Sequence, residues 1–304
     1  MKTPVKNIAA SILARLRNQT EAMNRPFAEV LQYYAMERFL YRLSKTRYAD
    51  KFILKGGLMF YVWDLPLRRP TRDIDFRGYV SGNRSTLLKI MDEVIGVSAL
   101  EDGLVFDSQS LSVEETQIDA DYQGIRIKLI ALLERTRIPV QIDIGFSDEL
   151  TSKADSIEYP NILSDLEAVH MQGYPKETVV AEKFHAMIRH SDLNSRMKDY
   201  YDLWLISETF NFEGKSLQKA IETTFKNRDT DLPVERPVSL STEFASANNT
   251  RWNNFLEKMN IETIESADFA NIIEQVWEFL EYPLQASLNQ TQSTRKWIPN
   301  KGWK

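Results

Sequence analysis

The segment Asp73-Ile74-Asp75 strongly limits how this chain can fold and what it can bind. In a β-strand, successive side chains alternate between two faces, so both aspartates project together while Ile74 enters the core. Their Cα atoms then lie about 6.5 Å apart, which lets carboxylate oxygens from both converge on divalent cations. The spacing therefore predicts a metal and phosphate site on a sheet.

A third aspartate lies in a run with the same alternation. From 139 to 146, apolar and polar positions alternate, which puts Asp143 on the polar face of a predicted strand. Such an aspartate is commonly just solvated, but Asp is disfavoured in strand interiors, and three gathered carboxylates need charge compensation. Two metal ions about 3.5 to 4 Å apart would supply it and would stabilise an in-line phosphoryl displacement. We therefore predict Asp73, Asp75 and Asp143 as ligands of Mg²⁺, with Mn²⁺ as an alternative.

Length and composition describe an ordinary globular protein. The 304 residues suffice for two domains or one large one. The absence of cysteine excludes disulfides, thiolate zinc sites and cysteine nucleophiles, and it is compatible with a reducing cytoplasm. We see neither a signal peptide nor a run of eighteen apolar residues. We therefore expect a cytoplasmic protein with no membrane partner.

Charge bears on nucleic-acid binding. A net charge of -5 argues against a protein that coats nucleic acid, but it permits a local basic patch. The C-terminal stretch 284–304 has no acidic residue, and it combines Arg295, Lys296, Lys301 and Lys304 with Trp297 and Trp303. This composition suits base stacking and phosphate contact, or else belongs to a loosely docked tail.

Hydrophobic periodicity divides the chain into three predicted parts. Residues 1–50 are expected to be helical, 51–170 to form an α/β core, and 171–304 to be helical again. Within the core, strands are predicted at 52–54, 74–76, 125–129 and 139–146, with a helix at 84–95. The last part has predicted helices at 177–189, 195–208, 217–225 and 269–280, and a loop at 227–241.

Four ordered segments resemble the AbiEii/AbiGii toxin family of DNA polymerase β-like nucleotidyltransferases. They are Lys55-Gly56-Gly57 with Arg69-x-Thr71-x-Asp73-Ile74-Asp75, then 141–146, 177–183 and 196–203. The resemblance extends over residues 28–207. It implies an α+β fold, with a polymerase β-like nucleotidyltransferase core on a mixed sheet, N-terminal helices and a helical C-terminal domain.

The same resemblance implies a toxin of a type IV toxin–antitoxin or abortive-infection (phage-defence) pair. Related members transfer nucleotides from NTPs to RNA, so we expect NMP transfer to an RNA acceptor, with Mg²⁺ and release of pyrophosphate. The tRNA 3′ end is the expected acceptor, and a cognate antitoxin would be encoded nearby. Two alternatives stay open: nucleotidylation of a protein, and binding of NTP and metal without transfer.

Roles for individual residues follow from the resemblance. Lys55, Gly56 and Gly57 would contact the nucleotide, the glycines by opening a helix close to the triphosphate. The wider superfamily usually has Gly-Ser here. Lys183 would donate its ammonium to the triphosphate, although a lysine beside an apolar helix face can also simply snorkel to solvent.

The remaining roles concern three charged residues. Asp202 would orient Lys183 or help to bind the nucleotide, and Arg69 and Arg72 would contact phosphates or the RNA end. The alternatives are an exposed ion-pair ladder that includes Asp199 and Asp202, and arginines that act as structural counter-ions. The catalytic set implied by the family is Asp73, Asp75, Asp143, Lys183 and Asp202, and Asp143 would also help to deprotonate the attacking hydroxyl.

Overall fold

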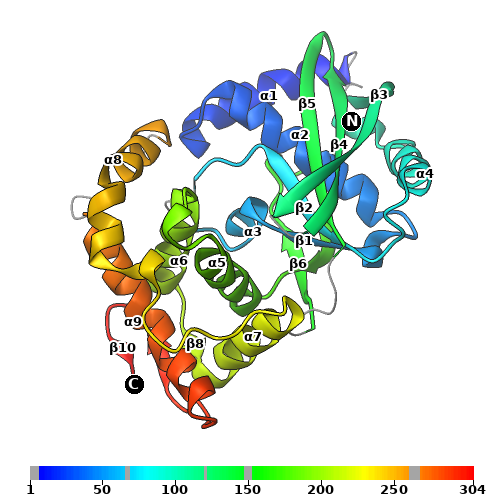
Figure 1. Ribbon diagram of the computed structural model, residues 1–304. Coiled ribbons are helices and arrows are strands. Elements are labelled where there is room, and N and C mark those ends of the chain that lie inside the picture. The colour runs from blue at the N-terminus through cyan, green and yellow to red at the C-terminus, as the bar shows by residue number, and fades with distance from the viewer. Residues whose placement is uncertain (1–6, 66–68, 120–121, 147–152, 260–267) are drawn as a thin grey trace. The chain divides into compact units, whose positions relative to one another are not determined.

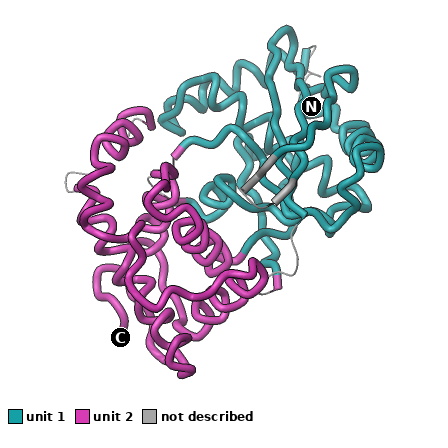
Figure 2. The backbone as a smooth tube through the Cα atoms, in the orientation of Figure 1, with its two compact units in different colours: residues 1–64, 70–147, 154–174 teal, residues 65–69, 148–153, 175–304 magenta. Residues whose placement is uncertain are grey.

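The computed structural model describes residues 7–65, 69–119, 122–146, 153–259 and 268–304, which belong to two compact units (Figure 2). The first unit comprises 1–64, 70–147 and 154–174, and the second comprises 65–69, 148–153 and 175–304. The N-terminal helices thus belong to the same unit as the predicted core. The division at 50 and 170 stays a prediction. No helix in the described part of the chain has the length and hydropathy of a membrane-spanning segment.

The first unit is built on a seven-stranded sheet with the order β3-β4-β5-β2-β1-β7-β6 (Figure 1). β2 runs parallel to β5 and β1 runs parallel to β7, while the other neighbouring pairs are antiparallel. The sheet is therefore mixed, as expected. The strands are β1 (Phe52–Lys55), β2 (Asp73–Gly78), β3 (Leu104–Asp119), β4 (Tyr122–Leu133), β5 (Thr136–Gly145), β6 (Asp155–Tyr159) and β7 (Val169–Gly173).

Helices cover the apolar side of this sheet. They are α1 (Ile8–Met23), α2 (Phe27–Ser44), α3 (Gly57–Val62) and α4 (Arg84–Ile95). α2 packs against β5 and β7, and both α1 and α4 pack against α2. Ile74 and Phe76 of β2 lie in the core that α2 covers. The predicted helix at 84–95 and all four predicted strands are confirmed, whereas β3, β6 and β7 were not predicted.

The second unit is mainly helical. It contains α5 (Lys176–His190), α6 (Met197–Thr209), α7 (Gly214–Asn227), α8 (Thr242–Lys258) and α9 (Phe269–Leu288). Four of these confirm predicted helices. α8 was not predicted because it is largely polar; its buried positions include Phe244, Asn248 and Trp252, which repeat every four residues but include an asparagine.

The C-terminal stretch is an integral part of the second unit. Strands β9 (Lys296–Ile298) and β10 (Gly302–Trp303) form a small sheet with β8 (Phe212–Glu213). The Trp297 indole is buried and donates a hydrogen bond to the Ser207 carbonyl (2.8 Å), and Trp303 donates to the Phe279 carbonyl (3.2 Å). The prediction of a loosely docked tail is therefore wrong. The two indoles pack within the unit rather than standing open for base stacking.

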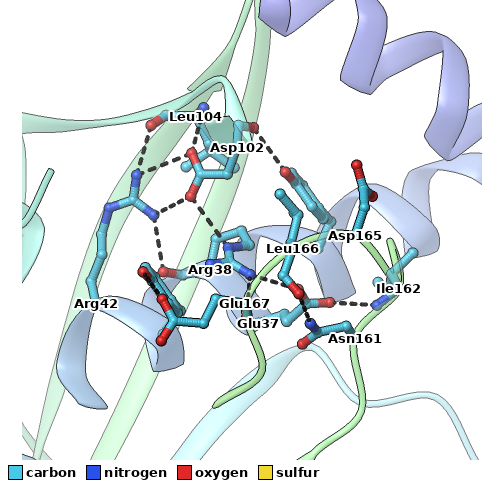
Figure 3. A network of polar contacts seen from close by, with 12 residues as sticks. Glu37, Arg38, Arg42, Asp102, Leu104, Asn161, Ile162, Asp165, Leu166 and Glu167 are labelled. Atoms are coloured by element: carbon cyan, nitrogen blue, oxygen red, sulfur yellow. Dashed lines mark hydrogen bonds and ion pairs between the residues drawn. The ribbon is translucent and has the colours of Figure 1, made fainter. Parts of the chain in front are cut away.

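A buried ion network joins α2 to the start of β3 (Figure 3). Asp102, in the 3-10 helix η2 (Leu100–Asp102), accepts hydrogen bonds from Arg42 NH1 (2.7 Å) and Arg38 Nε (3.3 Å). Arg38 also donates to Glu37, whose second oxygen accepts from the Ile162 amide (2.8 Å). Two guanidinium groups thus offset two carboxylates, and each of the four side chains is at most 3% exposed. Such a network is costly to break from one side, because an unpaired charge then stays buried.

We expect Asp102→Asn to lower the free energy of unfolding by about 3 to 5 kcal/mol, because it leaves two buried guanidinium groups short of one counter-charge. Urea denaturation measures this loss. Asp50→Asn is the matched control, since Asp50 pairs with Lys51 on the surface and should cost less than about 1 kcal/mol. Equal stability of the two variants would contradict a stabilising role for the network.

Glu37 predicts a pH dependence of stability. Burial raises the pKa of Glu37 from 4.5 to about 7, although the Ile162 amide and Arg38 act to lower it. Because the folded state holds this proton more tightly than the unfolded state, ionisation of Glu37 lowers stability as pH rises through that interval. Between pH 4.5 and 7, wild type should therefore lose about 2 to 3 kcal/mol relative to Glu37→Gln, which cannot titrate there. Urea denaturation at several pH values measures this loss, and stability–pH curves of wild type and Glu37→Gln that run parallel would contradict the prediction. Glu93→Gln, which changes a glutamate on the surface, is the control.

Candidate active site

The three aspartates are brought together by strand pairing. β2 and β5 lie side by side in parallel, with Asp75 opposite Asp143 and Asp73 opposite Gln141. Ile74 is fully buried while Asp73 and Asp75 are half-buried, so the predicted alternation is confirmed. One carboxylate oxygen from each aspartate lies within 4.8 Å of the others. A set of three carboxylates at this spacing fits a hard divalent cation such as Mg²⁺.

Asp143 is held by donors from its own strand and from β4. Arg126 Nε donates to Asp143 Oδ1 and Arg126 NH2 donates to Asp143 Oδ2, both at 2.8 Å, and Gln141 Nε2 donates to Oδ2 at 3.2 Å. The hydrogen bonds to Asp143 raise the pKa of Arg126, helped by the charges of Asp143 and Asp73. No role was predicted for Arg126, although the alternation of apolar and charged residues along 125–129 was a signal that could have placed it on a polar face.

The two glycines leave room for this carboxylate cluster. Gly56 has φ +70°, and a Cβ on it would lie 1.9 Å from Asp75 Oδ2. A Cβ on Gly57 would lie 2.7 Å from Thr71 Oγ1, which itself donates to Asp73 Oδ1 at 2.9 Å. The hydroxyl of Thr71 thus stands where a serine at position 57 would need space. This gives the Gly-Gly pair a steric reason, while its role toward phosphate stays a prediction.

Two further candidates lie in the first unit. Lys55 is half-buried opposite Asp75 in the β1–β2 register, and its ammonium lies 5.9 Å from the ring centre of Tyr174. The Arg72 side chain is exposed, and its carbonyl accepts a hydrogen bond from Gln32 (3.3 Å). Phosphate contact by either residue stays a prediction.

The second unit contains Lys183 in a network between α5 and α6. Lys183 Nζ donates to Asp199 Oδ1 (2.8 Å) and to Asp202 Oδ2 (2.7 Å). Arg69 Nε donates to Asp202 Oδ1 (3.1 Å), and Arg196 Nε donates to Asp199 Oδ2 (2.6 Å). Both aspartate side chains are 0% exposed. The alternative of an exposed ion-pair ladder is therefore wrong for these residues.

The electrostatics of this network keep Lys183 charged. Burial by itself would lower the pKa of Lys183, but Asp199 and Asp202 raise it above its ordinary value. Burial would likewise raise the pKa of Asp199, yet Lys183 and Arg196 hold it well below its usual range. The Lys183 side chain keeps 14% exposure, while both carboxylates are fully buried. The network thus presents a charged ammonium to solvent, which suits an anion.

The structure therefore gathers most of the predicted residues into two sets, one within each unit. The first set comprises Gly56, Gly57, Asp73, Asp75 and Asp143, and the second comprises Arg69, Lys183 and Asp202. Thr71 and Arg196 join these sets by hydrogen bonding. Both stand in the motifs 69–75 and 196–203, where no role could be assigned to them from spacing alone.

A family model identifies the class of protein to which the chain is similar. A family described as nucleotidyl transferase AbiEii toxin, type IV TA system, matches residues 38–281. JHP933 from Helicobacter pylori is structurally similar, with 14% identity, a TM-score of 0.49, and coverage of 86% of this chain and 97% of that one. A candidate nucleotidyltransferase from H. pylori is also similar, with 13% identity and a TM-score of 0.47. The match covers 86% of this chain and 97% of that one. No curated protein matches the chain.

Gly56→Ala should displace Asp75, because the new methyl group would overlap its carboxylate and the backbone conformation disfavours a side chain. We expect a loss of about 2 kcal/mol or more in the free energy of unfolding. Weaker Mn²⁺ binding, read by paramagnetic resonance, should accompany it. Gly82→Ala is the control, since the atoms nearest to its Cβ would belong to the Phe146 ring, the first at 3.3 Å. Unchanged Mn²⁺ affinity in Gly56→Ala would contradict this account.

Proposed function

The chain belongs to the AbiEii family of nucleotidyl transferase toxins of type IV toxin–antitoxin systems, and we propose that it transfers NMP from an NTP to an RNA acceptor. The expected polymerase β-like fold is confirmed by the mixed sheet together with the family match. The observation that carries the proposal is the convergence of Asp73, Asp75 and Asp143. Family membership implies an NTP substrate and an antitoxin partner. The tRNA 3′ end is the acceptor that we propose, with phage defence as its setting.

Asp73, Asp75 and Asp143 would hold Mg²⁺ in this proposal. When bound, Mg²⁺ neutralises phosphate charge and makes the acceptor hydroxyl more acidic. The acceptor oxygen forms a bond to the α-phosphorus, the bond between that phosphorus and the α–β bridging oxygen breaks, and pyrophosphate leaves. The hydroxyl proton passes to Asp143. Arg126 donates to both Asp143 oxygens, so the proton would go to a lone-pair position that Arg126 leaves open or vacates.

Lys183 would act on the triphosphate. Its ammonium is held by two buried carboxylates, which keep it charged and restrict its position. A pre-positioned cation stabilises the charge that develops on departing pyrophosphate, without reorganisation during the reaction. Asp202 orients Lys183 in this account, and Arg69 in turn anchors Asp202 through its Nε and NH2 groups.

Incubation with α-labelled NTPs, Mg²⁺ and total cellular RNA tests the proposal. Wild type should label tRNA-sized RNA, and Asp73→Asn and Lys183→Ala should each lower the rate by about 10²-fold or more, because each removes charge stabilisation of the transition state. Asp50→Asn and Lys226→Ala, on exposed side chains, should keep the wild-type rate.

The position of the label decides between the alternatives. Label on a protein rather than on RNA would indicate a protein nucleotidyltransferase. NTP binding without release of pyrophosphate, in the presence of RNA and of the antitoxin, would indicate a nucleotide-binding protein. Transfer that persists in Asp73→Asn would overturn the assigned site.

A further inference from the structure

A row of four charged residues crosses four neighbouring strands of the sheet. Arg126 on β4 is opposite Asp143 on β5, Asp143 is opposite Asp75 on β2, and Asp75 is opposite Lys55 on β1. Directly paired residues project on the same face of a sheet and lie close enough to interact. The row therefore has two carboxylates at its centre and a cation at each end.

Arg126 uses much of the hydrogen-bonding capacity of Asp143. A carboxylate has about four lone-pair positions. Arg126 takes one on each oxygen in a two-point pair at 2.8 Å, and Gln141 takes a further one on Oδ2 at 3.2 Å. The Asp143 side chain is 9% exposed and that of Arg126 is 35% exposed. The aspartate is thus confined, while the guanidinium keeps access to solvent and to ligands.

We propose that Arg126 is a positioning residue that occupies Asp143 in the absence of nucleotide and thereby makes metal binding depend on NTP binding. This inference rests on the proposed function, since it concerns the same carboxylates. With Arg126 in place, the charge of the three aspartates and this arginine is about −2 instead of −3, which lowers their attraction for a free divalent cation. The fork of the guanidinium also competes directly for the oxygens that a metal needs.

An NTP would reverse this competition. Its phosphate oxygens attract both a divalent cation and a guanidinium, which binds phosphate as readily as carboxylate in a two-point geometry. If Arg126 moves from Asp143 to a phosphate, Asp143 becomes available to the metal and to the proton of the acceptor hydroxyl. The metal and the nucleotide would then bind with positive coupling.

Mn²⁺ titration followed by paramagnetic resonance, without nucleotide, tests the first half of the proposal. Arg126→Gln should bind Mn²⁺ about tenfold more tightly than wild type. Lys128→Gln is the matched control. It removes the same charge from the same strand two residues away, but Lys128 pairs with the exposed Glu114 at 2.9 Å. An affinity in Arg126→Gln no higher than in Lys128→Gln would overturn the proposal.

Repeating the titration with α,β-methylene analogues of the four NTPs tests the coupling. The preferred analogue should increase the Mn²⁺ affinity of wild type more than that of Arg126→Gln. The ratio of the Mn²⁺ affinity with the analogue to that without it should therefore be about tenfold lower in the variant. Arg126→Lys, which keeps the charge but not the fork, should lie between the two. An equal ratio in wild type and Arg126→Gln would overturn the proposal.

Thermal unfolding separates this role from a purely structural one. Without metal, Arg126→Gln should melt below wild type, because Asp143 loses its partner, and saturating Mn²⁺ should close the gap. A difference in melting temperature that persists at saturation would assign Arg126 to structure alone.

The Asp75→Asn variant shows whether Mn²⁺ binds at the carboxylates. Mn²⁺ binding that is unaffected by Asp75→Asn would overturn the metal site and the proposed function with it. Binding that needs Asp75 but ignores Arg126 would overturn this inference alone.

Discussion

Mutual repulsion among three carboxylates on one face of a sheet is the constraint on which the arrangement around β2 depends. The β2–β5 register places Asp75 beside Asp143, and a slip by one residue would send an entire strand's aspartates to the opposite face. The surroundings then have to accommodate the gathered charge. Thr71 donates to Asp73, Gly56 leaves space for Asp75, and Arg126 neutralises Asp143. Together these features allow three carboxylates to lie close to one another on the sheet.

The two buried ion networks differ in their access to solvent. Around Asp102, all four charged side chains are at most 3% exposed, and the network ties α2 to the start of β3. Around Lys183, Asp199 and Asp202 are fully buried, but the Lys183 side chain keeps 14% exposure and that of Arg196 keeps 32%. Buried pairs gain little stability over an apolar core unless they are well satisfied. The Lys183 network therefore presents cationic groups that an anionic ligand can reach, whereas the Asp102 network does not.

Local patterns predicted what depends on local geometry. Alternation correctly placed Asp73 and Asp75 on the face opposite the core, because the two-residue period of a strand needs no tertiary information. It could not show that Arg126 lies opposite Asp143, since that register comes from pairing across the sheet. The spacing of Asp199 and Asp202 is the same on a buried and on an exposed helix, so their burial was missed. Tail composition likewise showed charges and indoles, but not the carbonyls that Trp297 and Trp303 contact.

The two sets of charged residues suit different kinds of group, each within its own unit. In the first unit, Asp73, Asp75 and Asp143 gather on one face of the sheet, and carboxylate oxygens at this spacing suit a hard divalent cation. In the second unit, two buried carboxylates keep the Lys183 ammonium charged and restrict its position, which suits a phosphate group. The family implies an NTP substrate, and the chemistry of each set thus agrees with it independently of which base the nucleotide carries.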